Sequence, residues 1–161
     1  MLKQLTNYTP EEFESQKHPF TIKRLSPTIG AELNDIDLKK DLSQEEKDHI
    51  YSALLTYKVI FFRSQDITTE DHLRFGRYFG ELEIHPFAPL GANREENPEV
   101  LRITHNKDNK PRENAWHSDV TWRLKPSLGS ILRMIETPPV GGDTLFANME
   151  AAYENLPDEI K

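Results

Sequence analysis

The order of apolar and polar positions in the first sixty residues predicts two short strands followed by a helix. Alternation over 20–25 indicates a half-buried strand, and 26–33 is typical of a turn that leads into a second strand. Ser43 and Glu46 have the spacing of a capping box, which predicts that a helix begins there. Its apolar stripe has helical spacing and consists of Ile50, Tyr51, Leu54, Leu55 and Tyr57.

The segments on either side of this helix predict an N-terminal arm, a buried strand and a second helix. Residues 1–19 carry scattered charge and little periodicity, so we expect an arm there. Residues 58–63 are β-branched and aromatic, and the run is too short for a helix, so it predicts a buried strand. Thr68 and Asp71 predict the start of a second helix, which we expect to end at Gly80.

The second half of the chain shows short apolar runs between turns. Residues 81–112 predict mostly loop, and 138–142 predicts a turn. Asn148 is a good cap for a short helix at 150–155. Three runs predict strands, namely 100–103, 129–136 and 143–146. Short strands separated by turns are typical of a sheet sandwich or barrel, so the pattern predicts a β-rich α+β fold.

Composition excludes several function classes. The 161 residues are 36% hydrophobic, which suits one domain with a core. The formal net charge of −7 argues against a nucleic-acid or anionic-membrane partner, because phosphate binding needs clustered basic residues. The absence of Cys excludes disulfides and thiolate metal sites, which leaves His and carboxylates as strong ligands. No signal peptide or membrane-spanning run is evident, so we expect a cytoplasmic protein.

One pair of residues has the spacing of a metal site. In a strand, residues i and i+2 share a face, so we expect His117 and Asp119 to project together into the interior of the sheet sandwich. With a second His, such a pair forms the facial triad that holds non-haem Fe(II). The alternative is a surface pair, because one such spacing arises easily by chance. His85 precedes Pro86, which favours an extended backbone aimed into a pocket, and its alternative is solvent exposure.

Several motifs surround this pair: 116–122, Pro126, 138–146 and 151–153, with 27–31, 59–63 and 78–86 upstream. Together they resemble the taurine/α-ketoglutarate dioxygenase (TauD/TfdA-like) family over nearly all of residues 20–157. The resemblance implies a double-stranded β-helix, or jelly roll, with flanking helices. It also implies Fe(II) as cofactor and 2-oxoglutarate as cosubstrate. Residues 20–161 are therefore interpreted as the truncated, N-terminal part of a single dioxygenase domain, preceded by the arm 1–19.

The resemblance implies a role for five residues in hydroxylation of a substrate by O₂, with release of succinate and CO₂. His117 and Asp119 would be the catalytic metal ligands, and Thr144 would hydrogen-bond the distal carboxylate of 2-oxoglutarate. His85 would bind an anionic head group, with Val120 beside that pocket. The substrate implied is a small anionic organic molecule, either a sulfonate, an alkyl sulfate or a carboxylate.

Two residues depart from the pattern of taurine-specific members. Ala88 replaces an aromatic residue, and Glu113 replaces an amide. Because a carboxylate repels a sulfonate, taurine itself is disfavoured.

The second His of the triad and the Arg that pairs with 2-oxoglutarate have no candidate in the sequence. All six His lie at or before His117, and Arg123 and Arg133 fall too early for the family position. We therefore expect no turnover from the chain alone. Three interpretations stay open: part of a working oxygenase, a non-catalytic remnant, or a cupin-like metal-binding module without 2-oxoglutarate. Unpaired strand edges predict instability or association into a homo-oligomer.

Overall fold

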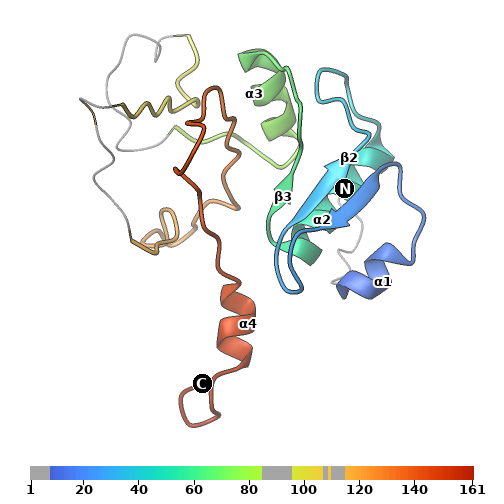
Figure 1. Cartoon of the computed structure of the whole chain (residues 1–161), viewed down its shortest axis with the longest axis vertical. Coiled ribbons are helices and arrows are strands. Elements are labelled where there is room, and N and C mark those ends of the chain that lie inside the picture. The colour runs from blue at the N-terminus through green and yellow to red at the C-terminus, as the bar shows by residue number, and fades with distance from the viewer. Residues whose placement is uncertain (1–7, 85–95, 107–108, 110–114) are drawn as a thin grey trace. The chain divides into compact units, whose positions relative to one another are not determined.

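The structure is a computed structural model in which residues 8–84, 96–106, 109 and 115–161 are described (Figure 1). The chain forms two compact units. The first consists of Met1–Asp71 with Glu136–Lys161, and the second of His72–Ile135. The regular elements lie mostly in the first unit, whereas the second is built largely from irregular segments.

A three-stranded sheet forms the centre of the first unit, in the order β1-β2-β3. β1 (Thr21–Arg24) pairs antiparallel with β2 (Ala31–Asn34), and β2 pairs parallel with β3 (Ile60–Phe61). The turn between β1 and β2 needs Gly30, whose φ of +88° is a conformation that other residues adopt rarely. Both strands predicted at this end of the chain are confirmed.

Helix α2 (Gln44–Tyr57) supplies much of the core of this unit. Ser43 caps it, and the reciprocal bonds of a capping box join Ser43 and Glu46 as the sequence predicts. The fully or nearly buried apolar side chains of the helix and of β2 are Ile50, Ala53, Tyr57, Ala31 and Leu33. Burial of a large apolar side chain such as Ile50 or Leu33 contributes about 1.5–3 kcal/mol, which helps to give this part of the chain a defined fold.

The N-terminal segment is more ordered than the predicted arm. Residues Pro10–Glu14 form helix α1, and Phe13 is 1% exposed. Arg24 on β1 donates from Nη2 to Glu11 (2.7 Å) and from Nε to Glu14 (2.6 Å), and the Tyr57 hydroxyl also donates to Glu14. Burial, followed by the bond to Glu14, raises the pKa of Tyr57, so this hydroxyl stays protonated at physiological pH.

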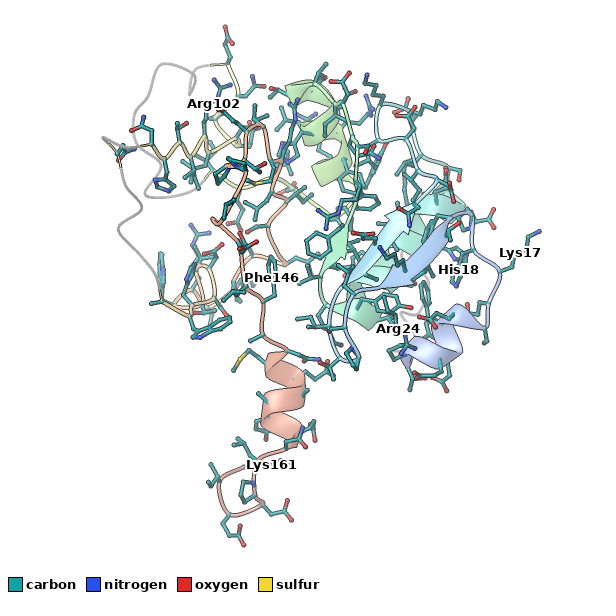
Figure 2. The ribbon with its side chains drawn as sticks, viewed as in Figure 1. Lys17, His18, Arg24, Arg102, Phe146 and Lys161 are labelled. Atoms are coloured by element: carbon teal, nitrogen blue, oxygen red, sulfur yellow. The ribbon has the colours of Figure 1, made fainter. Side chains whose placement is uncertain are left out.

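Two histidines join the segment after α1 to α2. His18 is labelled in Figure 2. Its Nε2 lies 2.6 Å from the carbonyl oxygen of Phe13, and its Nδ1 lies 2.9 Å from Nδ1 of His49. Because a carbonyl only accepts, His18 Nε2 donates, and a neutral His18 must then accept a hydrogen bond from His49 at Nδ1. If both rings were doubly protonated, the two Nδ1–H groups would face each other as donors and the hydrogen bond could not form. The bond therefore requires that at least one of the two histidines is neutral.

The two remaining helices follow their predicted caps. Helix α3 (Thr69–Arg77) begins after reciprocal bonds between Thr68 and Asp71, and it ends before the predicted stop at Gly80. Helix α4 (Met149–Glu154) is capped by Asn148. The Asn148 side chain also donates to the carbonyl of Thr28 (2.7 Å), so α4 is tied to the β1–β2 turn.

Several predicted strands are absent from the structure. The strand expected over 58–63 is reduced to the two residues of β3, and the predictions for 100–103, 129–136 and 143–146 are wrong. None of the described residues after Phe61 lies in a strand. A strand exists only where a neighbour supplies hydrogen-bond partners, and no described segment provides such a neighbour for these runs.

The side chains of the runs that fail to form strands are largely exposed. Among them Leu132, Met134, Ile135 and Leu145 are 66–77% exposed. The described residues therefore form a small mixed α/β structure and not a complete jelly roll. No helix within the described ranges is long and apolar enough to span a membrane.

The His18–His49 bond predicts that acid weakens the attachment of the N-terminal segment. Burial, and then the charge on His18, lower the pKa of His49, while Glu45 and Asp48 act in the opposite direction. A histidine with a lowered pKa stabilises the folded state above its ordinary pKa of about 6.5 and loses that contribution as the pH falls below it. We expect the protection of the amides of residues 10–18 against hydrogen exchange, measured relative to the intrinsic rate at each pH, to fall between pH 7.5 and pH 5.5. The variant His49→Gln should lack this pH-dependent loss of protection, and an equal loss in the variant would contradict the assignment.

Candidate metal-binding site

His117 has a defined tautomer. Its Nδ1 lies 3.0 Å from the carbonyl oxygen of Ala115. A carbonyl only accepts hydrogen bonds, so Nδ1 carries the proton of the neutral ring and donates it. The lone pair of the neutral ring is therefore on Nε2. A metal-binding histidine almost always donates its other ring N–H in this way, which fixes the orientation of the imidazole.

Asp119 lies next to the unprotonated nitrogen of His117. Its Oδ1 is 3.4 Å from Nε2, and the two side chains are 65% and 60% exposed. Two ligand atoms that are each about 2.1 Å from a divalent metal, at angles of 90–110°, lie roughly 3.0–3.4 Å apart. A neutral nitrogen lone pair and a carboxylate oxygen at this separation fit a shared cation. The structure thus brings together the two residues that the sequence singles out.

The backbone around this pair differs from the prediction. Residues 117–119 are not in a strand, and both side chains are exposed instead of facing a sheet interior. Val120 follows with φ of +47°, a left-handed conformation that costs a β-branched residue about 1–3 kcal/mol. The carbonyl of Val120 accepts from the backbone N–H of Arg123 (3.1 Å), which closes a turn directly after the pair. This turn replaces the strand as the element that positions the ligands.

Ser130 is a neighbour that the sequence did not indicate. Its hydroxyl lies 3.3 Å from Oδ2 of Asp119, within donating distance. The next residue, Ile131, accepts a hydrogen bond at its carbonyl from Nε2 of His72 on α3 (3.0 Å). Only the observed fold, and no motif, brings residue 130 to the carboxylate eleven positions earlier.

An ion pair joins two other segments of the second unit. Arg123 Nη1 donates to Glu83 (2.6 Å), and the Ser127 hydroxyl donates to the same carboxylate (2.9 Å). The segment that ends in Glu83 is therefore fastened to the turn after Asp119.

Of the other predicted site residues, Thr144 and Val120 lie within the described part of the chain, and His85 does not. Thr144 is exposed and belongs to the first unit, where it follows a turn in which Gly141 and Gly142 both have φ of +78°. Val120 is half-buried. The predicted substrate residue His85 lies outside the described residues, as do Ala88 and Glu113.

A third metal ligand is not found in the described part of the chain. No group of three or more His, Asp or Glu side chains among residues 8–84, 96–106, 109 and 115–161 is placed to hold a metal ion. His105 is described but does not join the pair. The sequence supplies no His after position 117.

Known proteins that are similar to this chain include an alkylsulfatase and a sulfate ester dioxygenase. The chain is 36% identical over 141 residues to an alkylsulfatase of Acinetobacter baylyi, which covers 87% of this chain and 43% of that protein. It is 33% identical over 153 residues to an alpha-ketoglutarate-dependent sulfate ester dioxygenase of Pseudomonas putida, which covers 94% of this chain and 48% of that protein. The chain thus spans about half the length of these relatives.

A solved structure of a taurine dioxygenase is also similar to this chain. The crystal structure of a taurine dioxygenase from Burkholderia xenovorans matches with a TM-score of 0.75 and 40% identity, covering 88% of this chain and 49% of that one. The profile of the family described as taurine catabolism dioxygenase TauD, TfdA matches residues 21–161. Because this match takes in far more than half of the sequence and includes the His117–Asp119 pair, the chain belongs to the TauD, TfdA dioxygenase family.

Proposed function

We propose that the chain belongs to an Fe(II)- and 2-oxoglutarate-dependent dioxygenase that hydroxylates a small anionic organic substrate. The observation that carries the proposal is the 3.4 Å approach of His117 Nε2 to Asp119 Oδ1, with the other ring nitrogen held by Ala115. An imidazole and a carboxylate are the ligand types that non-haem Fe(II) oxygenases use. The relative from Pseudomonas putida is named as an alpha-ketoglutarate-dependent sulfate ester dioxygenase, and the solved structure from Burkholderia xenovorans is named as a taurine dioxygenase.

Each site residue has a specific task in this proposal. His117 binds the metal through Nε2, and Asp119 binds it through Oδ1. Thr144 donates its hydroxyl to the distal carboxylate of 2-oxoglutarate. His85 holds the anionic group of the substrate, and Val120 forms an apolar wall beside it.

Iron with bound 2-oxoglutarate supplies the oxidative step, in which O₂, the oxo acid and a substrate C–H bond give succinate, CO₂ and a C–OH group. The protein binds and orients the reactants. In the neutral ring, donation from His117 Nδ1 to the carbonyl of Ala115 leaves the lone pair on Nε2, where it can bind the metal. Charge selects the substrate class, because a cationic or hydrogen-bonding His85 favours an anion.

We further propose that residues 20–161 form the N-terminal part of one dioxygenase domain with jelly-roll architecture. The family match over 21–161 supports this assignment. The exposed apolar side chains of 129–136 and 143–146 also support it, because such runs form strands when a neighbouring strand pairs with them. Association of copies through these runs is the corresponding expectation for the isolated chain.

The two proposed ligands predict a selective loss of metal binding on substitution. In the unsubstituted chain, Mn²⁺ should broaden the backbone amide signals of residues 115–120 in a saturable way. His117→Ala and Asp119→Ala should each weaken this binding by at least about tenfold, because one of only two ligands is removed. His105→Ala serves as the matched control and should bind Mn²⁺ as the unsubstituted chain does. Broadening that persists in both ligand variants would refute the site.

The role of Thr144 separates the oxygenase from a metal-binding module without oxo-acid chemistry. Under nitrogen, Fe(II) and 2-oxoglutarate should give a visible charge-transfer band with the unsubstituted chain. Thr144→Ala should raise the 2-oxoglutarate concentration at half-saturation by at least about tenfold, because a hydrogen bond to a charged group is worth about 1.5–3 kcal/mol. Thr137→Ala, an exposed threonine nearby, is the control. A metal-dependent signal without any response to 2-oxoglutarate would favour the binding module.

A further inference from the structure

We propose that Ser130 is a positioning residue for the metal-binding carboxylate of Asp119; this inference rests on the proposed function. The Ser130 hydroxyl lies 3.3 Å from Asp119 Oδ2, while Oδ1 of the same carboxylate lies 3.4 Å from His117 Nε2. The two oxygens of Asp119 therefore have different neighbours. A hydroxyl that donates to Oδ2 leaves Oδ1 as the oxygen that faces the cation.

The bond from Ser130 restricts how the carboxylate rotates. An exposed Asp side chain rotates readily about χ2, because this torsion joins an sp³ to an sp² carbon and is broad. A donor on one oxygen selects the rotation in which the other oxygen points toward His117. Less conformational entropy is then lost when a cation binds, so the affinity for the metal rises.

The two ligands are thus supported in the same manner. The carbonyl of Ala115 accepts from His117 Nδ1, and the hydroxyl of Ser130 donates to Asp119 Oδ2. In each case the atom that does not bind the metal is the one held by a hydrogen bond. Partners of this kind commonly change metal affinity by about 10–100-fold when they are removed.

Ser130 is itself held in place by a helix. The carbonyl of Ile131 accepts a hydrogen bond from His72 Nε2 on α3 (3.0 Å). This contact anchors the residue next to Ser130 on a regular element. Because Ser130 is exposed, its hydroxyl adds little to the stability of the fold, and its removal should act mainly on Asp119.

The test uses Co²⁺ alone as the probe and the complete 161-residue chain. The dissociation constant is measured from paramagnetic effects on the amide signals of residues 115–120 and from the visible absorption of bound Co²⁺. Ser130→Ala should raise the dissociation constant by about tenfold and shift the absorption band, with an unchanged thermal midpoint. Ser130→Thr keeps a hydroxyl and should restore both the affinity and the band.

A second serine in the same unit provides the matched control. Ser127 donates to Glu83 and not to Asp119, so Ser127→Ala should leave Co²⁺ binding unchanged. Equal affinity for Ser130→Ala and the unsubstituted chain, or failure of Ser130→Thr to restore what Ser130→Ala loses, would overturn the role of Ser130.

One further variant separates this inference from the proposed function. If His117→Ala abolishes Co²⁺ binding while Ser130→Ala has no effect, the metal site stands and only the role of Ser130 is wrong. If His117→Ala binds Co²⁺ like the unsubstituted chain, the proposed metal site is wrong, and the role of Ser130 is overturned with it.

Discussion

The hydrogen bond from His117 Nδ1 to the carbonyl of Ala115 determines what the candidate site can do. A neutral imidazole has one proton and two nitrogens, and the carbonyl, which can only accept, requires the proton on Nδ1. The lone pair then lies on Nε2, 3.4 Å from a carboxylate oxygen of Asp119. With the opposite tautomer, Nε2 would donate to that carboxylate and could not bind a cation. The backbone carbonyl of Ala115, two residues before the histidine, therefore favours the tautomer that the proposed metal site needs.

Local turns, and not a sheet, place these ligands in the described structure. Val120 adopts a left-handed backbone conformation directly after Asp119, and the Arg123–Glu83 ion pair fastens the turn that follows. Strain at a β-branched residue persists only where surrounding contacts hold it. The strained Val120 and the arginine of this ion pair thus lie within four residues of Asp119, in a solvent-exposed stretch.

The sequence predicted the first half of the fold better than the second because the signals there are local. Ser43 with Glu46, and Thr68 with Asp71, are caps whose hydrogen bonds depend only on residues three positions apart, and both form as predicted. The apolar run 129–136 also has strand-forming residues, but a strand needs hydrogen bonds from a distant segment. No described residue supplies them, so the run forms no strand and is largely exposed.

In the candidate site, too, the sequence predicts neighbours that are close along the chain and misses one that is farther away. The chemistry of His117 and Asp119 was readable from residue types and spacing, and the family match includes both. Ser130 lies eleven residues beyond Asp119, and no periodicity relates the two positions. The contact depends on the hydrogen bond between His72 on α3 and the carbonyl of Ile131, which holds the residue after Ser130. The pattern of residues along the chain does not predict this hydrogen bond.

The most direct test of this account is a ¹⁵N NMR measurement on the ring of His117 during a titration with Mn²⁺. The account predicts that Nδ1 is protonated and Nε2 is not, in the absence of metal, and that Mn²⁺ broadens Nε2 more strongly than Nδ1. A ring protonated at Nε2, or one in which Mn²⁺ broadens neither nitrogen, would contradict the assignment of His117 and Asp119 as metal ligands.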